Sequence, residues 1–275
     1  MEKRIINYLE QQCIKSPLNE RQDGGHYFDE PLVGFASVND PLFADYKQII
    51  GPFHRSPTEW LNLSGSTNAH KSGTVISWIL PISKEVRLSN RSQQKIPSKM
   101  WAHTRNFGEQ FNASLRRELV DLLQSAGHAA IAPQLSSHWQ EISIDGVGPS
   151  SCWSERHAAY AAGLGTFSLN DGLITKRGIA HRCGSIVTDL VLPPSPRQHR
   201  SHTHNCPFCR EKRCGACIAR CPVGALSVDG HDKIKCRAYT YVMLNDQLGS
   251  DYGVDITGCG LCQTKVPCET AIPKI

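Results

Sequence analysis

Long apolar runs, a secretion signal and a strong excess of charge of one sign are all missing from this sequence of 275 residues. No apolar stretch approaches the roughly 18 to 20 residues that cross a bilayer, so we expect no membrane span. The start, Met1-Glu2-Lys3-Arg4-Ile5-Ile6, lacks the apolar core and small-residue cleavage site of a signal peptide. We therefore expect a cytoplasmic protein.

The net charge of +5 is mild, and basic residues are mostly interspersed with acidic ones, so nucleic acid is not an expected partner. The densest basic stretch runs from Arg197 to Arg213 and contains His199, Arg200, His202, His204, Arg210 and Lys212. Such stretches are most often solvated loops. The alternative interpretation is a docking patch for an acidic electron donor, such as a low-potential ferredoxin or flavodoxin.

Regular elements are predicted mainly in the first 195 residues. A helix is expected near Lys3–Gln12, and the apolar, β-branched run from Gly73 to Leu80 predicts a strand buried on both faces, ended by Pro81. Apolar residues recur at helical spacing from about Phe107 to Ser125, and Gly127 follows where a left-handed cap would lie. With a short strand at Ala129–Ala132, this pattern is typical of an α/β unit.

Two further elements precede a proline-rich linker. Ser154 is a candidate N-cap for a short helix over Glu155–Ala162, and Glu155 stands at the positive end of its dipole. Gly184–Leu192 predicts another buried strand. Pro193, Pro194 and Pro196 then mark a linker, so we expect one domain over residues 1–195 and a second over 196–275.

Twelve cysteines are the strongest compositional signal, and nine of them fall between Cys206 and Cys268. Disulfide frameworks belong to small secreted domains, so dense cysteines in this chain indicate metal. The remaining three, Cys13, Cys152 and Cys183, are scattered.

The spacing of Cys214, Cys217 and Cys221-Pro222 is that of bacterial two-cluster ferredoxins, in which the cysteine before proline ligates the other cluster. This crossing predicts two 4Fe–4S clusters. The first set is Cys214, Cys217, Cys268 and either Cys206 or Cys209, and the second is Cys221, Cys236, Cys259 and Cys262.

Zinc is the alternative metal. Cys206-x2-Cys209 together with Cys214-x2-Cys217 could form a structural four-thiolate site. The cysteine–proline step and the second set of four thiols favour iron–sulfur clusters.

Several segments resemble the epoxyqueuosine reductases and their relatives, the corrinoid-dependent reductive dehalogenases. The resemblance covers roughly residues 70 to 270 and depends on motif order. The matching segments are Ser154-Glu155-Arg156-His157, Ala161-Ala162-Gly163-Leu164-Gly165-Thr166-Phe167, Gly172-Leu173-Ile174-Thr175, Gly184-Ser185-Ile186-Val187-Thr188-Asp189-Leu190 and the cysteine pattern.

The resemblance implies a nitroreductase-like α/β domain that holds cobalamin, followed by a ferredoxin-like double-cluster module. It favours Cys206 over Cys209 as a ligand and implies electron flow through the first and then the second cluster to cobalt. Glycines let backbone lie against a flat ring, and the implied cofactor contacts are Gly163, Gly165, Thr166, Phe167 and Ser168. Without the resemblance, the same residues would be an ordinary helix cap and turn.

The sequence also departs from the family. Where its tRNA-modifying members carry a proton-donating aspartate, six residues before Glu155, this chain has Pro149. Because the sequence ends seven residues after Cys268, we do not expect the helical repeats that follow the clusters in such members. No Asp-x-His-x-x-Gly segment occurs, and the start does not read as a twin-arginine export signal. Candidate proton donors are Tyr160, His157 and Cys152, although each is more often a packing residue.

Three functions remain open at this point. The first is a cobalamin-dependent iron–sulfur oxidoreductase that acts on an unknown small substrate. The second is an electron-transfer or corrinoid-reducing carrier that serves a corrinoid protein and has no substrate of its own. The third is a shortened tRNA epoxyqueuosine reductase, which the departures disfavour.

Overall fold

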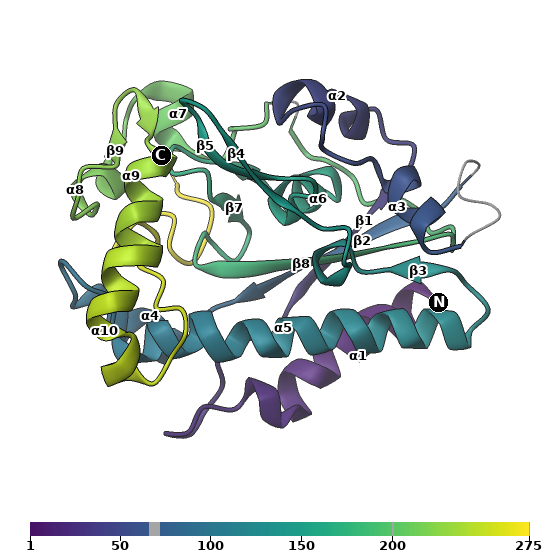
Figure 1. Ribbon diagram of the computed structural model, residues 1–275, viewed down its shortest axis with the longest axis horizontal. Coiled ribbons are helices and arrows are strands. Elements are labelled where there is room, and N and C mark those ends of the chain that lie inside the picture. Colours follow the sequence, from purple (N-terminus) through teal and green to yellow (C-terminus); the bar gives the residue numbers. More distant parts are fainter. Residues whose placement is uncertain (66–71, 200, 275) are drawn as a thin grey trace.

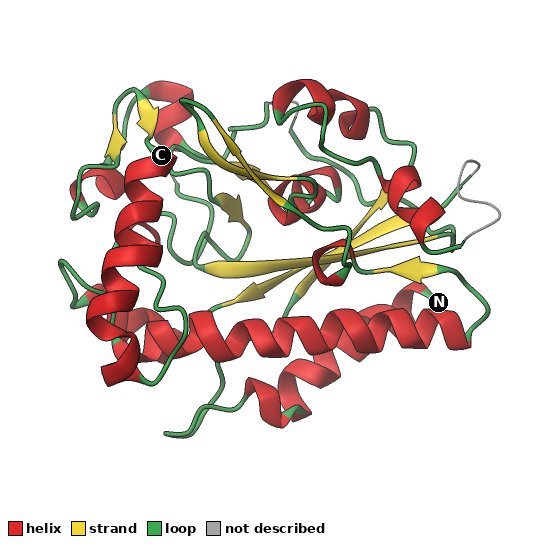
Figure 2. Cartoon of the chain, in the orientation of Figure 1, coloured by secondary structure: helices red, strands yellow, loops and turns green. Residues whose placement is uncertain are grey.

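A four-stranded antiparallel sheet organises the N-terminal part of the chain in the computed structural model, which describes residues 1–65, 72–199 and 201–274 (Figure 1). The strand order is β1-β2-β8-β3, and every neighbouring pair runs antiparallel. Strand β2 is buried at each of its positions because helices cover both faces of the sheet (Figure 2). The strands are β1 (Leu32–Ser37), β2 (Thr74–Pro81), β3 (Ala130–Ile131) and β8 (His181–Thr188).

Each face of the sheet has its own hydrophobic core. On one face, α1 (Glu2–Lys15) and α5 (Lys99–Ser125) pack against the strands, and Ile5, Leu115 and Trp78 are fully buried there. On the other face lie α2 (Leu42–Ile49), α3 (Pro57–Leu63) and α6 (Glu155–Ala161). Burial of apolar surface on both sides makes this part of the chain a complete folding core.

Helix α5 runs along the whole sheet and starts earlier than the pattern predicts. The Ser98 hydroxyl accepts a hydrogen bond from the backbone N–H of Trp101 at 3.1 Å, which caps the first turn. At the other end, Gly127 is left-handed, with φ of +84°, as the sequence predicts. The extra turns carry Arg105 toward the C-terminal region.

The C-terminal region consists of short helices and one small hairpin, and α10 crosses the beginning of α5 (Figure 1). The segment Ala238–Met243, which precedes α10 in this region, is a π-helix, a form that is frequent at functional sites. The regular elements are α7 (Pro207–Glu211), α8 (Ala216–Ala219), β9 (Leu226–Ser227), β10 (Gly230–His231), α9 (Lys233–Arg237), η3 (Ala238–Met243), α10 (Leu244–Tyr252) and η4 (Leu261–Gln263).

Polar contacts fix this region against α4 (Lys84–Arg91). The guanidinium of Arg220 donates to the Gln93 carbonyl at 2.7 Å and to the Thr264 carbonyl at 3.1 Å. The fully buried Asn90 donates to the Cys259 carbonyl at 3.3 Å. The loop that carries Cys259 therefore depends on α4 for its position.

The remaining elements are short. Two hairpins flank α6, namely β4 with β5 and β6 with β7. Their bounds, with those of two 3-10 turns, are β4 (Glu141–Ile144), β5 (Gly148–Ser151), β6 (Gly165–Phe167), β7 (Leu173–Thr175), η1 (Pro17–Asn19) and η2 (Pro133–Leu135).

The mixed α/β class is confirmed, and the predicted helices and strands all occur with shifted ends. The strand expected at Gly184–Leu192 is β8 and ends at Thr188 because the Thr188 hydroxyl accepts from the backbone N–H of Leu190 and turns the chain. Ser154 precedes α6, but its hydroxyl bonds the Nδ1 atom of His157 at 2.8 Å instead of capping the helix. The domain boundary and the ferredoxin-like module remain predictions.

Candidate functional site

Eight of the nine C-terminal cysteines line two separate cavities. A cavity of about 320 Å³, the larger thiol cavity, is lined by the second thiol set: Cys221, Cys236, Cys259 and Cys262. A cavity of about 20 Å³, the smaller thiol cavity, is lined by the first thiol set: Cys206, Cys214, Cys217 and Cys268. Cys209 lines neither of these cavities.

Most electrostatic couplings between the thiols stay within one set, but Cys217 of the first set also raises the pKa of Cys262, and Cys206 raises that of Cys209. Burial raises the pKa of Cys268 to about 12, and the thiols of Cys217 and Cys206 add to the rise. Burial likewise raises the pKa of Cys259 to about 12, with Cys236 and Cys221 acting in the same direction. Thiolates this close repel one another unless a cation lies between them.

Tight turns present the second thiol set to the larger thiol cavity. Cys259 lies between two glycines with φ of +65°, and a Cβ atom on Gly260 would come within 1.9 Å of the Trp101 ring. Only glycine allows this close approach. Cys236 lies on α9, whose first turn is capped by the Asp232 carboxylate.

The backbone around Cys268 is fixed by contacts with residues of the N-terminal part of the chain. Its carbonyl accepts from the backbone N–H of Ile179 at 2.8 Å, and the neighbouring Glu269 forms ion pairs with Arg87 and Arg91 at 3.5 and 3.6 Å. Cys206 is the N-cap of α7 and is 6% exposed. Within the described ranges, no three His, Cys, Asp or Glu side chains lie close enough to hold a single metal ion.

One asparagine lies between the two cavities and lines both. The Asn170 side chain donates from Nδ2 to the Cys262 carbonyl at 3.1 Å and accepts from the Ser168 hydroxyl at 2.7 Å. It is 7% exposed. The β6–β7 loop therefore joins the two thiol sets.

The larger thiol cavity is strongly cationic. One carboxylate, that of Asp171, lines it, and it bonds the Nδ1 atom of His231 at 2.9 Å. Burial opposes protonation of His231, but the hydrogen bond that this histidine donates to the Asp171 carboxylate raises its pKa to about 9. The lysine and arginine side chains in the lining are Arg105, Arg156, Arg182, Lys233 and Arg237.

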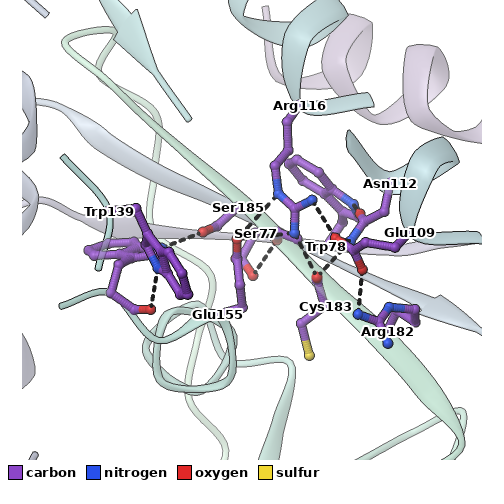
Figure 3. Close-up of polar contacts among 12 residues, drawn as sticks. Ser77, Trp78, Glu109, Asn112, Arg116, Trp139, Glu155, Arg182, Cys183 and Ser185 are labelled. Atoms are coloured by element: carbon purple, nitrogen blue, oxygen red, sulfur yellow. Dashed lines mark hydrogen bonds and ion pairs between the residues drawn. The ribbon is translucent and has the colours of Figure 1, made fainter. Parts of the chain in front are cut away.

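A buried polar network connects this cavity to the sheet (Figure 3). Arg182 on β8 forms an ion pair with Glu109, and Arg116 bridges Glu109 at 2.9 Å and Glu155 at 3.2 Å. Burial would raise the pKa of Glu109, but the charges of Arg182 and Arg116 lower it to about 2. Glu109 is therefore ionised and holds Arg182 in place.

The predicted cofactor contacts do not line the larger thiol cavity. Gly163, Gly165 and Thr166 line a separate cavity of about 250 Å³, and Ser168 lines the smaller thiol cavity. Gly163 has φ of +75°, and a Cβ atom there would meet the Pro196 carbonyl oxygen at 2.7 Å. Phe167 packs against His157, with ring centroids 4.7 Å apart.

The three candidate proton donors line none of these three cavities: Tyr160 and Cys152 are packed in the core, and His157 is partly buried. Tyr160 is 7% exposed and Cys152 is 3% exposed. Burial lowers the pKa of His157 to about 3. By contrast Pro149, at the position of the family's aspartate, lines the larger thiol cavity.

The basic stretch is partly neutralised. Arg197 forms an ion pair with Asp40, and Arg210 pairs with Glu211 at 2.7 Å. The rings of His199 and His204 stack at 3.6 Å. Arg200 lies outside the described residues.

Sequence reasoning missed the cavity wall that α5 and β8 provide. Arg105, Arg182 and Tyr241 come from three elements that are distant in sequence, and no motif joins them. Asp171 gives one local signal: it lies between Asn170 and Gly172 and adopts φ of +58°, a turn conformation that Asn and Asp tolerate.

Solved structures with a similar fold include an epoxyqueuosine reductase, which aligns with 98% of this chain at 16% identity and a TM-score of 0.52. The epoxyqueuosine reductase from Bacillus subtilis aligns with 99% of this chain at 17% identity and a TM-score of 0.52. A catabolic reductive dehalogenase in complex with 3-bromo-4-hydroxybenzoic acid aligns with 98% of this chain at 15% identity and a TM-score of 0.54. This chain has their fold.

The family resemblance seen in the sequence is thus confirmed at the level of fold. The chain spans 65% and 66% of the two reductases and 37% of the dehalogenase. No protein-family model and no curated protein sequence matches it. Among the described residues, no helix is both long and apolar enough to cross a membrane.

Proposed function

We propose that the chain is a cobalamin-dependent iron–sulfur oxidoreductase that passes electrons through two 4Fe–4S clusters to a bound corrinoid. The observation that carries this proposal is the division of eight thiols into two cavities of four. The division was expected from the crossed cysteine–proline motif, in which neighbouring Cys217 and Cys221 serve different clusters.

The ligands follow from the two linings. The first cluster takes Cys206, Cys214, Cys217 and Cys268, and the second takes Cys221, Cys236, Cys259 and Cys262. Cys206 is preferred to Cys209 because Cys206 lines the smaller thiol cavity and Cys209 does not. Asn170, between the sets, lies on the route from the first cluster to the second.

The corrinoid is proposed to lie beside the second cluster. Pro149, whose position the resemblance places in the catalytic centre, lines the same cavity as the second thiol set. Trp101, Arg105 and Asn170 line the wall there, and the Arg105 guanidinium could donate to the peripheral amides of a corrinoid. When bound, cobalamin would supply a strongly reducing cobalt centre. The contacts implied by the resemblance, Gly163, Gly165, Thr166, Phe167 and Ser168, lie outside this cavity, so they would meet only parts of the corrinoid that extend beyond it.

Metal analysis tests the proposal directly. Anaerobically purified protein should contain eight irons per chain, as two 4Fe–4S clusters require, and should retain cobalt near 1:1 after reconstitution with cobalamin and gel filtration. Cys262→Ser should lose about half of the iron, whereas Cys209→Ser should keep it all. Zinc in place of iron, or no retained cobalt, would refute the proposal.

A corrinoid-reducing or electron-carrying role without a substrate is the second candidate. Pro149 favours it, because a proline side chain cannot donate a proton where the family's reductases have an aspartate, and none of the three predicted donors lines the cavity. A stable complex with a corrinoid protein, with cobalamin bound but no substrate reduced, would support this role. Restoration of queuosine in a deficient strain would instead support tRNA epoxyqueuosine reduction.

A further inference from the structure

We propose that the larger thiol cavity contains an oxyanion site in which Arg105 and Arg182 bind a carboxylate or phosphate group. The site deepens the proposed function and rests on it, because the oxyanion would belong to the substrate or to the corrinoid. No motif in the sequence pointed to this pair.

The lining of the larger thiol cavity has an excess of positive charge. It includes five lysine and arginine side chains and one carboxylate, which is paired with His231. Two of these cations, Arg182 and Arg237, are paired with Glu109 and Glu141 outside the lining. Within the described part of the chain, neither Arg105, Arg156 nor Lys233 has a carboxylate oxygen within 4.0 Å. A cavity of this kind attracts anions.

The two guanidinium groups of the proposed site are held by contacts within the protein. Arg105 lies one helical turn before Glu109 on α5, its side chain contacts the Gly258 position, and it lies 5.8 Å from the centre of the Tyr241 ring. Arg182 is fixed on β8 by Glu109, which Arg116 also holds. Both arginines are therefore positioned before a ligand arrives, which lowers the cost of binding.

Arg182 also has a hydrogen-bond donor that is not used. Its Nε atom is buried and has no hydrogen-bond partner among the described residues, although the side chain as a whole is 25% exposed. The Oε2 atom of Glu109, which forms the ion pair with Arg182, likewise has no hydrogen bond there. A buried donor without a partner costs free energy that a ligand oxygen would recover. Burial and the nearby charge of Arg182 also lower the pKa of Arg105, because the two positive charges repel each other.

Carboxylate and phosphate match this arrangement best. A guanidinium presents parallel N–H donors that fit two oxygens of one planar or tetrahedral oxyanion. A neutral ligand would leave the repulsion between the arginines uncompensated. A competing explanation is that the cations serve only to balance the negative charge of the second cluster, and the experiment must separate the two.

The test is titration of anaerobic, iron-loaded protein with inorganic phosphate and with benzoate by calorimetry. We expect binding with a Kd in the millimolar range or tighter, weakened about tenfold or more in Arg105→Gln and in Arg182→Gln. Arg210→Gln, exposed and outside the three cavities, is the matched control and should bind as the wild type does. If a glutamine variant loses iron, the corresponding lysine variant, Arg105→Lys or Arg182→Lys, takes its place. Lysine keeps the positive charge but lacks the paired N–H donors of the guanidinium group.

Two outcomes would overturn the site: no binding of either anion by the wild type, or glutamine variants that bind normally while the potential of the second cluster shifts. Repeating the titration with cobalamin bound identifies the source of the oxyanion. Phosphate binding that disappears assigns the site to the corrinoid phosphodiester, and binding that persists assigns it to a substrate. Iron and cobalt analysis of the same samples tests the proposed function separately.

Discussion

The two parts of this molecule are stabilised by different means. The sheet with its helices buries two large apolar clusters, whereas the third cluster has six buried members, of which Leu169, Ile174 and Ile179 come from before residue 195. The partly buried residues around that third cluster include four cysteines. If the proposed clusters are present, a region with so little apolar core should need them to stay folded, while the sheet should not.

Removal of iron should give the largest contrast between the two parts. Because metal binding is coupled to folding, chelation under reducing conditions should abolish amide protection from α8 to η4. Protection in β2 and α5 should persist, since their contacts are apolar and complete. Hydrogen exchange followed by mass spectrometry measures both parts in one sample. Simultaneous loss of protection in β2 would show that the sheet also depends on the clusters.

A second contrast lies within α5, where an ion network crosses the apolar core. Arg116→Leu should destabilise the sheet unit by about 3–5 kcal/mol, because Glu155 would keep a buried charge without its partner. Chemical denaturation of the iron-loaded protein measures the change. Arg117→Leu, on the exposed side of the same helix, is the control and should change stability by less than about 0.5 kcal/mol. Equal effects would mean that the network contributes nothing specific.

The same division explains what the sequence could predict. The periodicity of Phe111, Leu115 and Leu119 and the apolar run of β2 are local patterns, so α5 and the central strand were predicted close to their observed positions. The cysteine–proline spacing likewise assigned seven thiols to the sets that line the two cavities, because ligand spacing is a local pattern. It left Cys206 and Cys209 open, and the role of all these thiols as ligands remains a prediction.

What could not be predicted depends on contacts between distant segments. Arg105 meets the cavity only because α5 starts at Lys99 and reaches the C-terminal region, and Arg182 faces it through the register of β8 with β2. Tyr160 and His157 share a helix next to a family motif, yet they pack against Phe167 rather than a cavity. Side-chain direction on a short helix is decided by tertiary packing.

A smaller effect is expected from the buried histidine of α6. In the unfolded chain His157 takes up a proton near pH 6.5, whereas burial lowers the pKa of the folded form to about 3. Stability should therefore fall as pH drops through this window, by about 2 kcal/mol at pH 5 from this group. His157→Gln should flatten the dependence, and His138→Gln, at an exposed position, should not. Denaturation midpoints at pH 7 and pH 5 provide the comparison, and parallel slopes for all three proteins would contradict it.

The smallest expected effect lies at the contact between the two thiol sets. Burial raises the pKa of the Cys262 thiol, and the Asn170 side chain acts against that rise. Asn170 donates to the Cys262 backbone carbonyl, so its amide dipole lies close enough to stabilise negative charge at the second set. A reduced cluster carries one more negative charge than an oxidised one. Loss of the donor should therefore lower the reduction potential of the second cluster.

Asn170→Ala should lower that potential by roughly 40 mV, which corresponds to one hydrogen bond of about 1 kcal/mol in a one-electron couple. Redox titration followed by electron paramagnetic resonance measures it. The first cluster is the internal control, because Asn170 borders its cavity but donates to Cys262 alone among the cysteines. If both potentials moved together, Asn170 would act through general packing of the β6–β7 loop, and the two thiol sets would not be separable in the way their linings indicate.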